Sequence, residues 1–230
     1  MRAIALIGVL LALGRLAVAG ETEHIRNASR HYELVIEVKT SKGEDSSTGP
    51  MDTVTGPAQV SIFKKGAKAP FQVLHLPNIA IERQVSTYDP KIDKKPRVLY
   101  GDDPNIVFED FNFDGNEDLA ICDGHDGGYG GPTYNVFLYN AASGRFVKSS
   151  ALSALTRDGY LGLFLVDRQR RHLVAFQKDG AAWHERQTFN MVNSKPVLIE
   201  DVVEDQRDGP DVVTTKRLVH GRWVKSVRKH

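Results

Sequence analysis

Oxygen-bearing side chains recur at nearly every second position between residues 110 and 118. Proteins bind calcium through about six to eight oxygen atoms at roughly 2.3–2.6 Å, and a tight loop supplies them from alternate residues. Gly115 occupies the sixth place of this loop, where the chain must turn sharply. We therefore predict a Ca²⁺ site in which Asn116 offers its backbone carbonyl and Asp118 closes the cage directly or through water. The predicted ligands are Asp110, Asn112, Asp114, Asn116 and Asp118.

The residues around this loop distinguish it from an EF-hand. Ile121 stands at the twelfth place, where an EF-hand has a bidentate Glu. The flanking residues 106–108 and 119–122 are short apolar runs that predict strands. A loop of the form Asp-x-Asn-x-Asp-Gly-x-x-Asp-Leu between strands resembles the calcium loops of integrin-type and other FG-GAP β-propeller repeats. The alternative is an acidic turn without metal, because Asp, Asn and Gly also form turns for local reasons.

The N-terminal 20 residues have the features of a secretory signal peptide. Arg2 gives a basic start, and the apolar run at residues 3–13 is too short to span a bilayer. Small residues at 17–20 suit cleavage by a signal peptidase. We expect residues 1–20 to be removed, leaving a periplasmic protein without stable membrane insertion. An N-terminal membrane anchor is the alternative.

The remaining residues, 21–230, are expected to form a single domain. The chain has 30 Lys and Arg residues against 29 Asp and Glu, and loss of Arg2 and Arg15 changes the formal charge from +1 to −1. Nucleic-acid binding requires a concentrated basic patch, so this balance argues against it. Cys122 is the single cysteine, which excludes an internal disulfide, and its apolar neighbours predict a buried thiol.

Short apolar or alternating runs, separated by polar turns, follow one another along most of the chain. This pattern predicts an all-β fold, an antiparallel meander arranged as a sandwich or as a β-propeller-like domain. A full propeller would need several blade repeats, and the calcium motif occurs once. We expect frayed backbone at 21–31, a loop at 41–57 and one helical turn at 152–155. Strands are expected at 34–40, 58–63, 71–76, 79–86, 106–108, 119–122, 134–139, 145–149, 160–167, 172–177, 183–192, 196–204, 211–219 and 223–227.

A second candidate site is the glycine-rich loop, residues 124–134, which contains five glycines. Ordering so many glycines costs conformational entropy, so we expect the loop either to have a function or to remain mobile. Tyr129 offers a large contact area and one hydroxyl, as interface anchors do. We expect calcium to hold the base of the loop and Pro132 to restrict its exit. A flexible linker with an idle Tyr129 is the alternative.

The run from residue 110 to residue 146 carries a family resemblance. It combines the calcium loop with Tyr-Gly-Gly-Pro-Thr-Tyr-Asn-Val-Phe-Leu-Tyr and Ser-Gly-Arg-Phe, and Lys-Pro-Val-Leu-Ile follows within residues 189–199. These motifs resemble the calcium-binding periplasmic immunity proteins of the antibacterial type IV secretion system of Xanthomonas-like bacteria. That family is related to periplasmic inhibitors of I-type lysozyme. The resemblance implies a β-propeller-like or sandwich fold, bound Ca²⁺ and an inhibitory loop. The loop residues are Gly124, His125, Asp126, Gly127, Gly128, Tyr129, Gly130, Gly131, Pro132, Thr133 and Tyr134.

The resemblance implies a lysozyme-like cell-wall hydrolase as the partner. Such enzymes hold two carboxyl groups in a deep cleft, which Tyr129, glycine amides and His125 could fill and hydrogen-bond. One alternative is an exported adhesion or scaffold module whose calcium is structural. The other is a glycosidase using Glu109 and Asp123, which we disfavour because the sequence has no evident pairing of a nucleophile with a base. The chain is therefore predicted not to be an enzyme.

Overall fold

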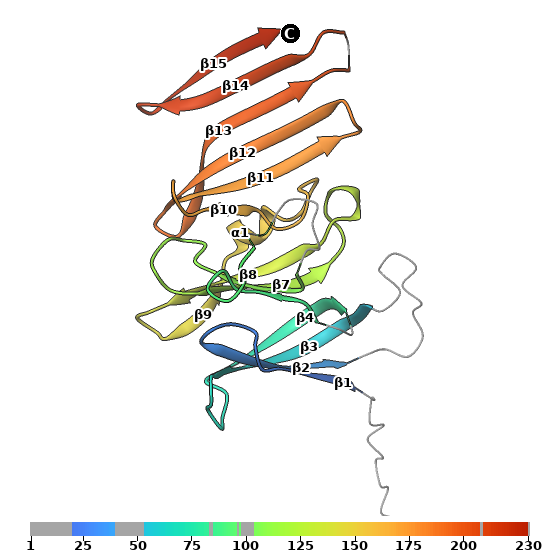
Figure 1. Cartoon of the computed structure of the whole chain (residues 1–230), viewed down its shortest axis with the longest axis vertical. Helices are drawn as coiled ribbons and strands as arrows, with labels where there is room; N and C mark the ends of the chain where they lie inside the picture. Colours follow the sequence, from blue (N-terminus) through green and yellow to red (C-terminus); the bar gives the residue numbers. More distant parts are fainter. Residues whose placement is uncertain are drawn as a thin grey trace, which may run out of the picture.

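The computed structural model describes residues 20–39, 53–82, 85–95, 97, 104–207 and 209–229. The predicted signal peptide lies outside these ranges except for Gly20. Figure 1 shows three β-sheets stacked along the long axis of the molecule, which confirms the predicted all-β fold. The sheets are open, so the architecture is an extended sandwich. No helix within the described ranges is long and apolar enough to cross a membrane.

The first sheet has four antiparallel strands in sequential order. The prediction of frayed backbone at 21–31 was wrong, because residues 20–25 form an edge strand whose Ile25 packs on the core. The strands predicted at 71–76 and 79–86 form one long strand, which pairs across a bulge between Gly56 and Ala58. The strands are β1 (Gly20–Ile25), β2 (Tyr32–Lys39), β3 (Thr53–Lys64) and β4 (Gln72–Glu82).

The second sheet lies in the middle and is covered on both faces. Its central strands are apolar and buried nearly throughout, as expected for strands without a solvent-facing side. One face packs on the first sheet, and the other packs on the helical turn and the third sheet. The first two strands pair in parallel over two residues, and the others pair antiparallel. The strands are β5 (Thr87–Tyr88), β6 (Ile106–Glu109), β7 (Asp118–Gly124), β8 (Thr133–Asn140) and β9 (Arg145–Lys148).

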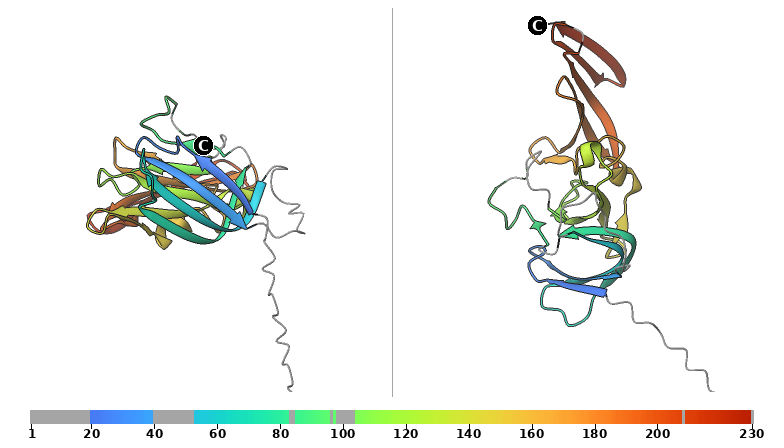
Figure 2. Two further views of the ribbon diagram at one scale, coloured as in Figure 1. Left: turned by 90° about the horizontal axis from the view of Figure 1, so that it is seen from below. Right: turned by 90° about the vertical axis from the view of Figure 1, so that its right-hand side faces the viewer.

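The third sheet is a six-stranded antiparallel meander. The predicted helical turn is present as α1 (Ser150–Ala154), which is capped by the Ser149 side chain. The strand predicted at 160–167 is shorter, because the segment before it turns into the second core with Leu163 and Phe164. Figure 2 shows the last strands projecting away from the rest of the molecule. The strands are β10 (Leu165–Asp167), β11 (His172–Asp179), β12 (Trp183–Val192), β13 (Lys195–Asp205), β14 (Val212–Val219) and β15 (Arg222–Lys229).

Strand β7 connects the two candidate sites. The calcium loop joins β6 to the start of β7, and the glycine-rich loop leaves from its end. Strands rise about 3.3 Å per residue, so the 7 residues of β7 separate the two loops by roughly 20 Å. Because β7 is buried on both faces, the positions of both loops are set by the core.

Candidate functional site

The calcium loop, residues 110–117, is a compact turn held by its own side chains. The Asp110 carboxylate accepts hydrogen bonds from the backbone N–H groups of Asp114 at 3.0 Å and Gly115 at 2.8 Å. Gly115 has φ of 92°, a left-handed conformation that favours glycine, as the sharp turn predicts. The neighbouring Phe113 also has positive φ, at 61°. The predicted turn geometry is therefore present.

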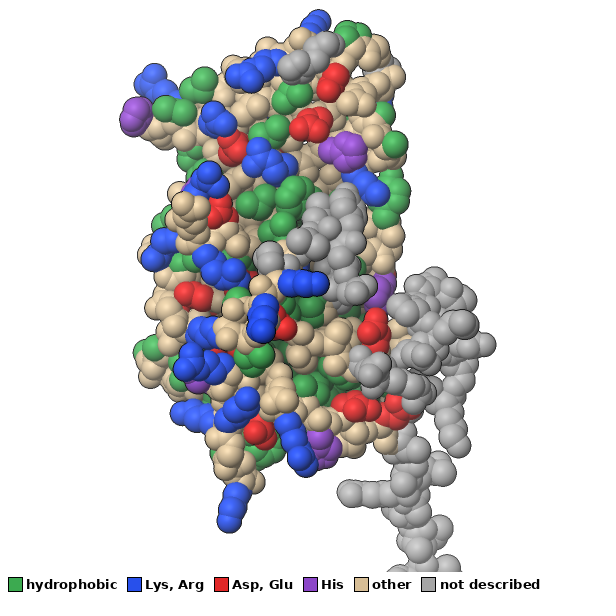
Figure 3. Space-filling model, in the orientation of Figure 1, with side chains coloured by type: hydrophobic (Ala, Val, Ile, Leu, Met, Phe, Trp, Pro, Cys, Tyr) green, Lys and Arg blue, Asp and Glu red, His purple; other side chains and the backbone are tan. Residues whose placement is uncertain are grey.

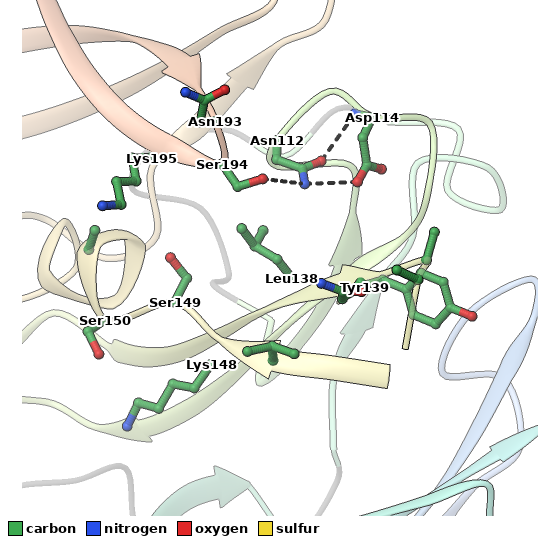
Figure 4. A pocket seen from close by; sticks show the side chains of 15 residues that line it. Asn112, Asp114, Leu138, Tyr139, Lys148, Ser149, Ser150, Asn193, Ser194 and Lys195 are labelled. Carbon is green, nitrogen blue, oxygen red and sulfur yellow. Dashed lines mark hydrogen bonds between the residues drawn. The ribbon is translucent and has the colours of Figure 1, made fainter. Parts of the chain in front are cut away.

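Asn112 and Asp114 bring further oxygens to the same turn. Asn112 Oδ1 accepts from the Asp114 N–H at 3.1 Å, and Asp114 Oδ1 accepts from the Asn116 N–H at 2.8 Å. Figure 4 shows the Asn112 amide between Asp114 and Ser194, to which Nδ2 donates at 2.9 and 3.4 Å. The same side chains border an open groove of about 640 Å³ that reaches the β12–β13 turn.

Asp118 lies beneath the turn and is fully buried. Its carboxylate accepts from the backbone N–H groups of Phe111 and Tyr139, both at 2.8 Å. Burial raises the Asp118 pKa to about 8 against the lowering effect of these hydrogen bonds, and the charges of Asp114 and Asp110 raise it further. The acids of this loop are thus close enough to repel one another, which a bound cation would relieve.

The donor set suits a hard cation, because every candidate atom is an oxygen. Within the described ranges, no group of three or more His, Cys, Asp and Glu side chains is placed to hold a metal by itself. A cation here would therefore draw on the Asn112 amide oxygen and the Asn116 carbonyl as well as on acids.

The glycine-rich loop is packed closely against the segment that precedes β10. The Gly128 N–H donates to the Tyr160 carbonyl at 2.8 Å, and the Gly127 N–H donates to the Gly131 carbonyl across the turn at 3.0 Å. A Cβ on Gly127 would lie 2.9 Å from the Tyr160 carbonyl oxygen, and one on Gly128 would clash with the Gly159 carbonyl. Gly127 and Gly128 are required because the loop backbone lies so close to the backbone of residues 159–160. The hydrogen bonds between these segments keep the loop ordered.

Tyr129 stands at the tip of this loop with 64% of its surface exposed. Its φ of 56° lies in the left-handed region, where a non-glycine residue is strained. The Gly180 N–H donates to the Tyr129 hydroxyl oxygen, and Lys178 Nζ lies 4.4 Å from the ring centroid. Residues of the β11–β12 turn and the end of β11 therefore hold the tyrosine side chain in place. Gly180 is 51 residues away in the chain, and no local sequence signal indicates this contact.

The base of the loop is held by an ion pair. Asp123 accepts from Arg157 Nη2 at 2.5 Å and from the Thr133 hydroxyl at 2.8 Å. The calcium loop lies at the other end of β7, so the expectation that calcium holds this base stays a prediction. Sequence reasoning missed Arg157, which follows α1 and is distant in the chain.

Three further expectations are resolved by burial and contacts. Cys122 is buried, as predicted. Tyr134 is fully buried and donates its hydroxyl to the Pro104 carbonyl at 2.8 Å, so it supports the loop from within. The N–H groups of Gly127, Gly128, Gly130 and Gly131 all bond within the protein, which leaves the glycine amides unable to serve as the donors that we expected for a partner.

The two carboxylates of the glycosidase alternative are far apart. Glu109 pairs in register with Asp118, five residues before Asp123 on β7, which corresponds to about 17 Å. Glycosidase acid pairs are separated by about 5–9.5 Å. Glu109 is instead buried against Arg168, and burial raises its pKa to about 7.

Comparisons with known proteins identify a similar fold in a solved structure. No family model matches the chain, and no curated protein matches it. A solved structure described as "Structure of a Xanthomonas Type IV Secretion System related protein" is similar to it, with a TM-score of 0.69 and 23% sequence identity. The match covers 92% of this chain and 94% of that chain. The chain therefore has the fold of that secretion-system-related protein over nearly its whole length.

Proposed function

We propose that this protein is a periplasmic inhibitor, acting as an immunity protein, of a lysozyme-like peptidoglycan hydrolase. The observation that carries the proposal is Tyr129, an exposed aromatic side chain at the tip of an otherwise tightly packed loop. The fold similarity to a Xanthomonas type IV secretion system related protein supports a secretion-system context for this chain. Export through residues 1–20 would place it in the compartment where such hydrolases act.

The loop would inhibit by filling the catalytic cleft of its partner. The Tyr129 hydroxyl oxygen accepts from Gly180, so its own proton remains free to be donated to a cleft carboxylate. The ring supplies the buried contact area typical of an interface anchor. Because the loop is ordered before binding, little conformational entropy would be lost on association.

Calcium would serve the stability of the sandwich in this proposal. Asp110, Asn112, Asp114 and the Asn116 carbonyl would hold the ion, and Asp118 would close the cage directly or through water. The ion would lie at the opposite end of β7 from Tyr129, so the loop tip is held by Gly180 and Lys178, and the loop base by the Asp123–Arg157 pair.

The test is inhibition of purified lysozyme-like hydrolases, including type IV secretion effectors, by the mature chain. Tyr129→Ala should weaken inhibition by at least tenfold with an unchanged melting temperature. Tyr129→Phe removes only the hydroxyl and should weaken inhibition less than Tyr129→Ala does. If wild-type protein at high concentration leaves every such hydrolase active, the inhibitor proposal fails. The exported adhesion or scaffold module with structural calcium would then be the better account.

A further inference from the structure

The end of the third sheet has a charge opposite to that of the rest of the protein. Residues 212–229 contain six Lys and Arg residues and no Asp or Glu. Removing these six and the two arginines of residues 1–20 from the total of 30 leaves 22 cations against 29 acids in residues 21–211, a formal charge of −7. The cations are Lys216, Arg217, Arg222, Lys225, Arg228 and Lys229. Figure 3 shows blue basic and green apolar side chains at this end of the molecule.

The cations of β14 and β15 differ in their partners. Lys216 Nζ lies 2.9 Å from Asp201, and Arg217 pairs with Glu200, both on β13. On β15, by contrast, no Lys or Arg side chain has an acidic partner among the residues that the structure describes. All eight residues of this strand are exposed. Strand β15 thus carries four positive charges that no acid in the described ranges compensates.

Strand β15 is also the edge of its sheet. It pairs with β14 on one side, and no described strand pairs with the backbone N–H and C=O groups of its other side. Alternation along a strand puts Val224 and Arg228 on one face and Trp223, Lys225 and Val227 on the other. Trp223 is 48% exposed, Val224 54% and Val227 49%. Each face therefore combines cations with exposed apolar side chains.

The charge, the edge position and the side-chain alternation of β15 indicate what kind of partner it would bind. A second β15 would bring like charges together, and basic side chains on edge strands oppose such pairing. Interfacial membrane segments segregate apolar and charged side chains onto opposite faces, which β15 does not. An added strand projects side chains alternately to both faces, so it would meet both cationic sets. We propose that β15 is a docking edge for an extended segment of a partner protein in which pairs of Asp or Glu alternate with pairs of apolar residues, so that each face of the added strand carries both kinds of side chain.

This site is independent of the proposed inhibition. The β11–β12 turn that clamps Tyr129 belongs to the same sheet, but β15 is three strands beyond β12, or about 14 Å at usual strand spacing. The two sites use different residues, so substitutions on β15 test the docking edge without changing the glycine-rich loop.

The experiment uses the mature chain and a fluorescein-labelled peptide in which Glu-Glu pairs alternate with Val-Val or Thr-Thr pairs, so that each face of the peptide strand carries Glu. Fluorescence anisotropy at low salt should show saturable binding that weakens at least tenfold at high salt. Lys225→Glu/Arg228→Glu should weaken binding at least tenfold. The matched control is Lys65→Glu/Lys68→Glu, which makes the same charge change in the exposed β3–β4 turn and should alter binding less than twofold.

A second peptide separates strand addition from simple charge attraction. Methylation of alternate backbone nitrogens removes the donors that a new edge pairing requires while leaving the charge unchanged. The methylated peptide should bind at least tenfold more weakly, and the unmodified peptide should protect β15 amides from hydrogen exchange. Equal binding of both peptides would overturn the proposal. So would equal losses in the two charge variants, tighter binding to phosphatidylglycerol vesicles or single-stranded DNA, or self-association through β15.

Discussion

The ion pair at the base of the glycine-rich loop predicts how strongly loop order controls inhibition. Asp123 and Arg157 meet at 2.5 Å, and their side chains are 11% and 32% exposed. Hydrogen bonds to charged groups contribute about 1.5–3 kcal/mol when shielded, and exposed ion pairs contribute about 0.2–1 kcal/mol. Since the arginine is about one-third open to solvent, which screens the pair, we expect about 1.5 kcal/mol, the lower limit of the shielded range.

The variant Arg157→Gln keeps a polar side chain but removes the charge. If the loop must be re-ordered in order to bind, the loss of about 1.5 kcal/mol corresponds to roughly a tenfold higher dissociation constant for the hydrolase. The same free energy lowers the melting temperature of a domain of this size by about 3–6 °C. Titration calorimetry with the hydrolase and a thermal melt measure the two effects separately.

Two further variants serve as controls for the effect of Arg157→Gln. Arg145→Gln removes an exposed charge on β9 and should change either quantity little. Asp123→Asn/Arg157→Gln removes both charges, so part of the loss should be recovered, because no unpaired carboxylate remains. The reasoning is refuted if Arg157→Gln melts early yet inhibits as well as wild type, or if Arg145→Gln is equally damaging.

Three other predictions follow from the contacts. Gly128→Ala should weaken inhibition more than Gly130→Ala, because a Cβ at Gly128 would clash with the Gly159 carbonyl oxygen, whereas one at Gly130 meets nothing within 4 Å and is strained only by the φ of 71°; equal losses would contradict the packing argument. Ca²⁺ at 100 times its dissociation constant should stabilise the wild type by about 2.7 kcal/mol, and Asp114→Ala should abolish this shift. Removal of Ca²⁺ by a chelator should leave inhibition within a few-fold of its value with Ca²⁺. A complete loss of inhibition would show that the ion takes part in the action of the loop. Gln72→Ala should cost about 2 kcal/mol, because Gln72 bonds the Phe146 N–H and C=O, both at 2.8 Å; urea unfolding would show it.

Strand positions could largely be predicted because apolar periodicity reports burial directly. The continuous apolar runs at β6 and β7 belong to strands covered on both faces. The same rule missed β1, since its polar residues alternate with few apolar ones and only Ile25 reaches the core. It also overextended β10, because a buried loop containing Leu163 and Phe164 is as apolar as a strand.

The amino-acid sequence by itself determined the turn chemistry of the calcium loop and the composition of the glycine-rich loop, because both depend on residues close together in the chain. Tertiary structure alone decided that Gly180 and Lys178 hold Tyr129, and that Arg157 holds Asp123. It also placed an uncompensated basic strand at the edge of the third sheet. These relations join segments distant in sequence, and they arise from sheet stacking and strand pairing, which no local pattern of residues encodes.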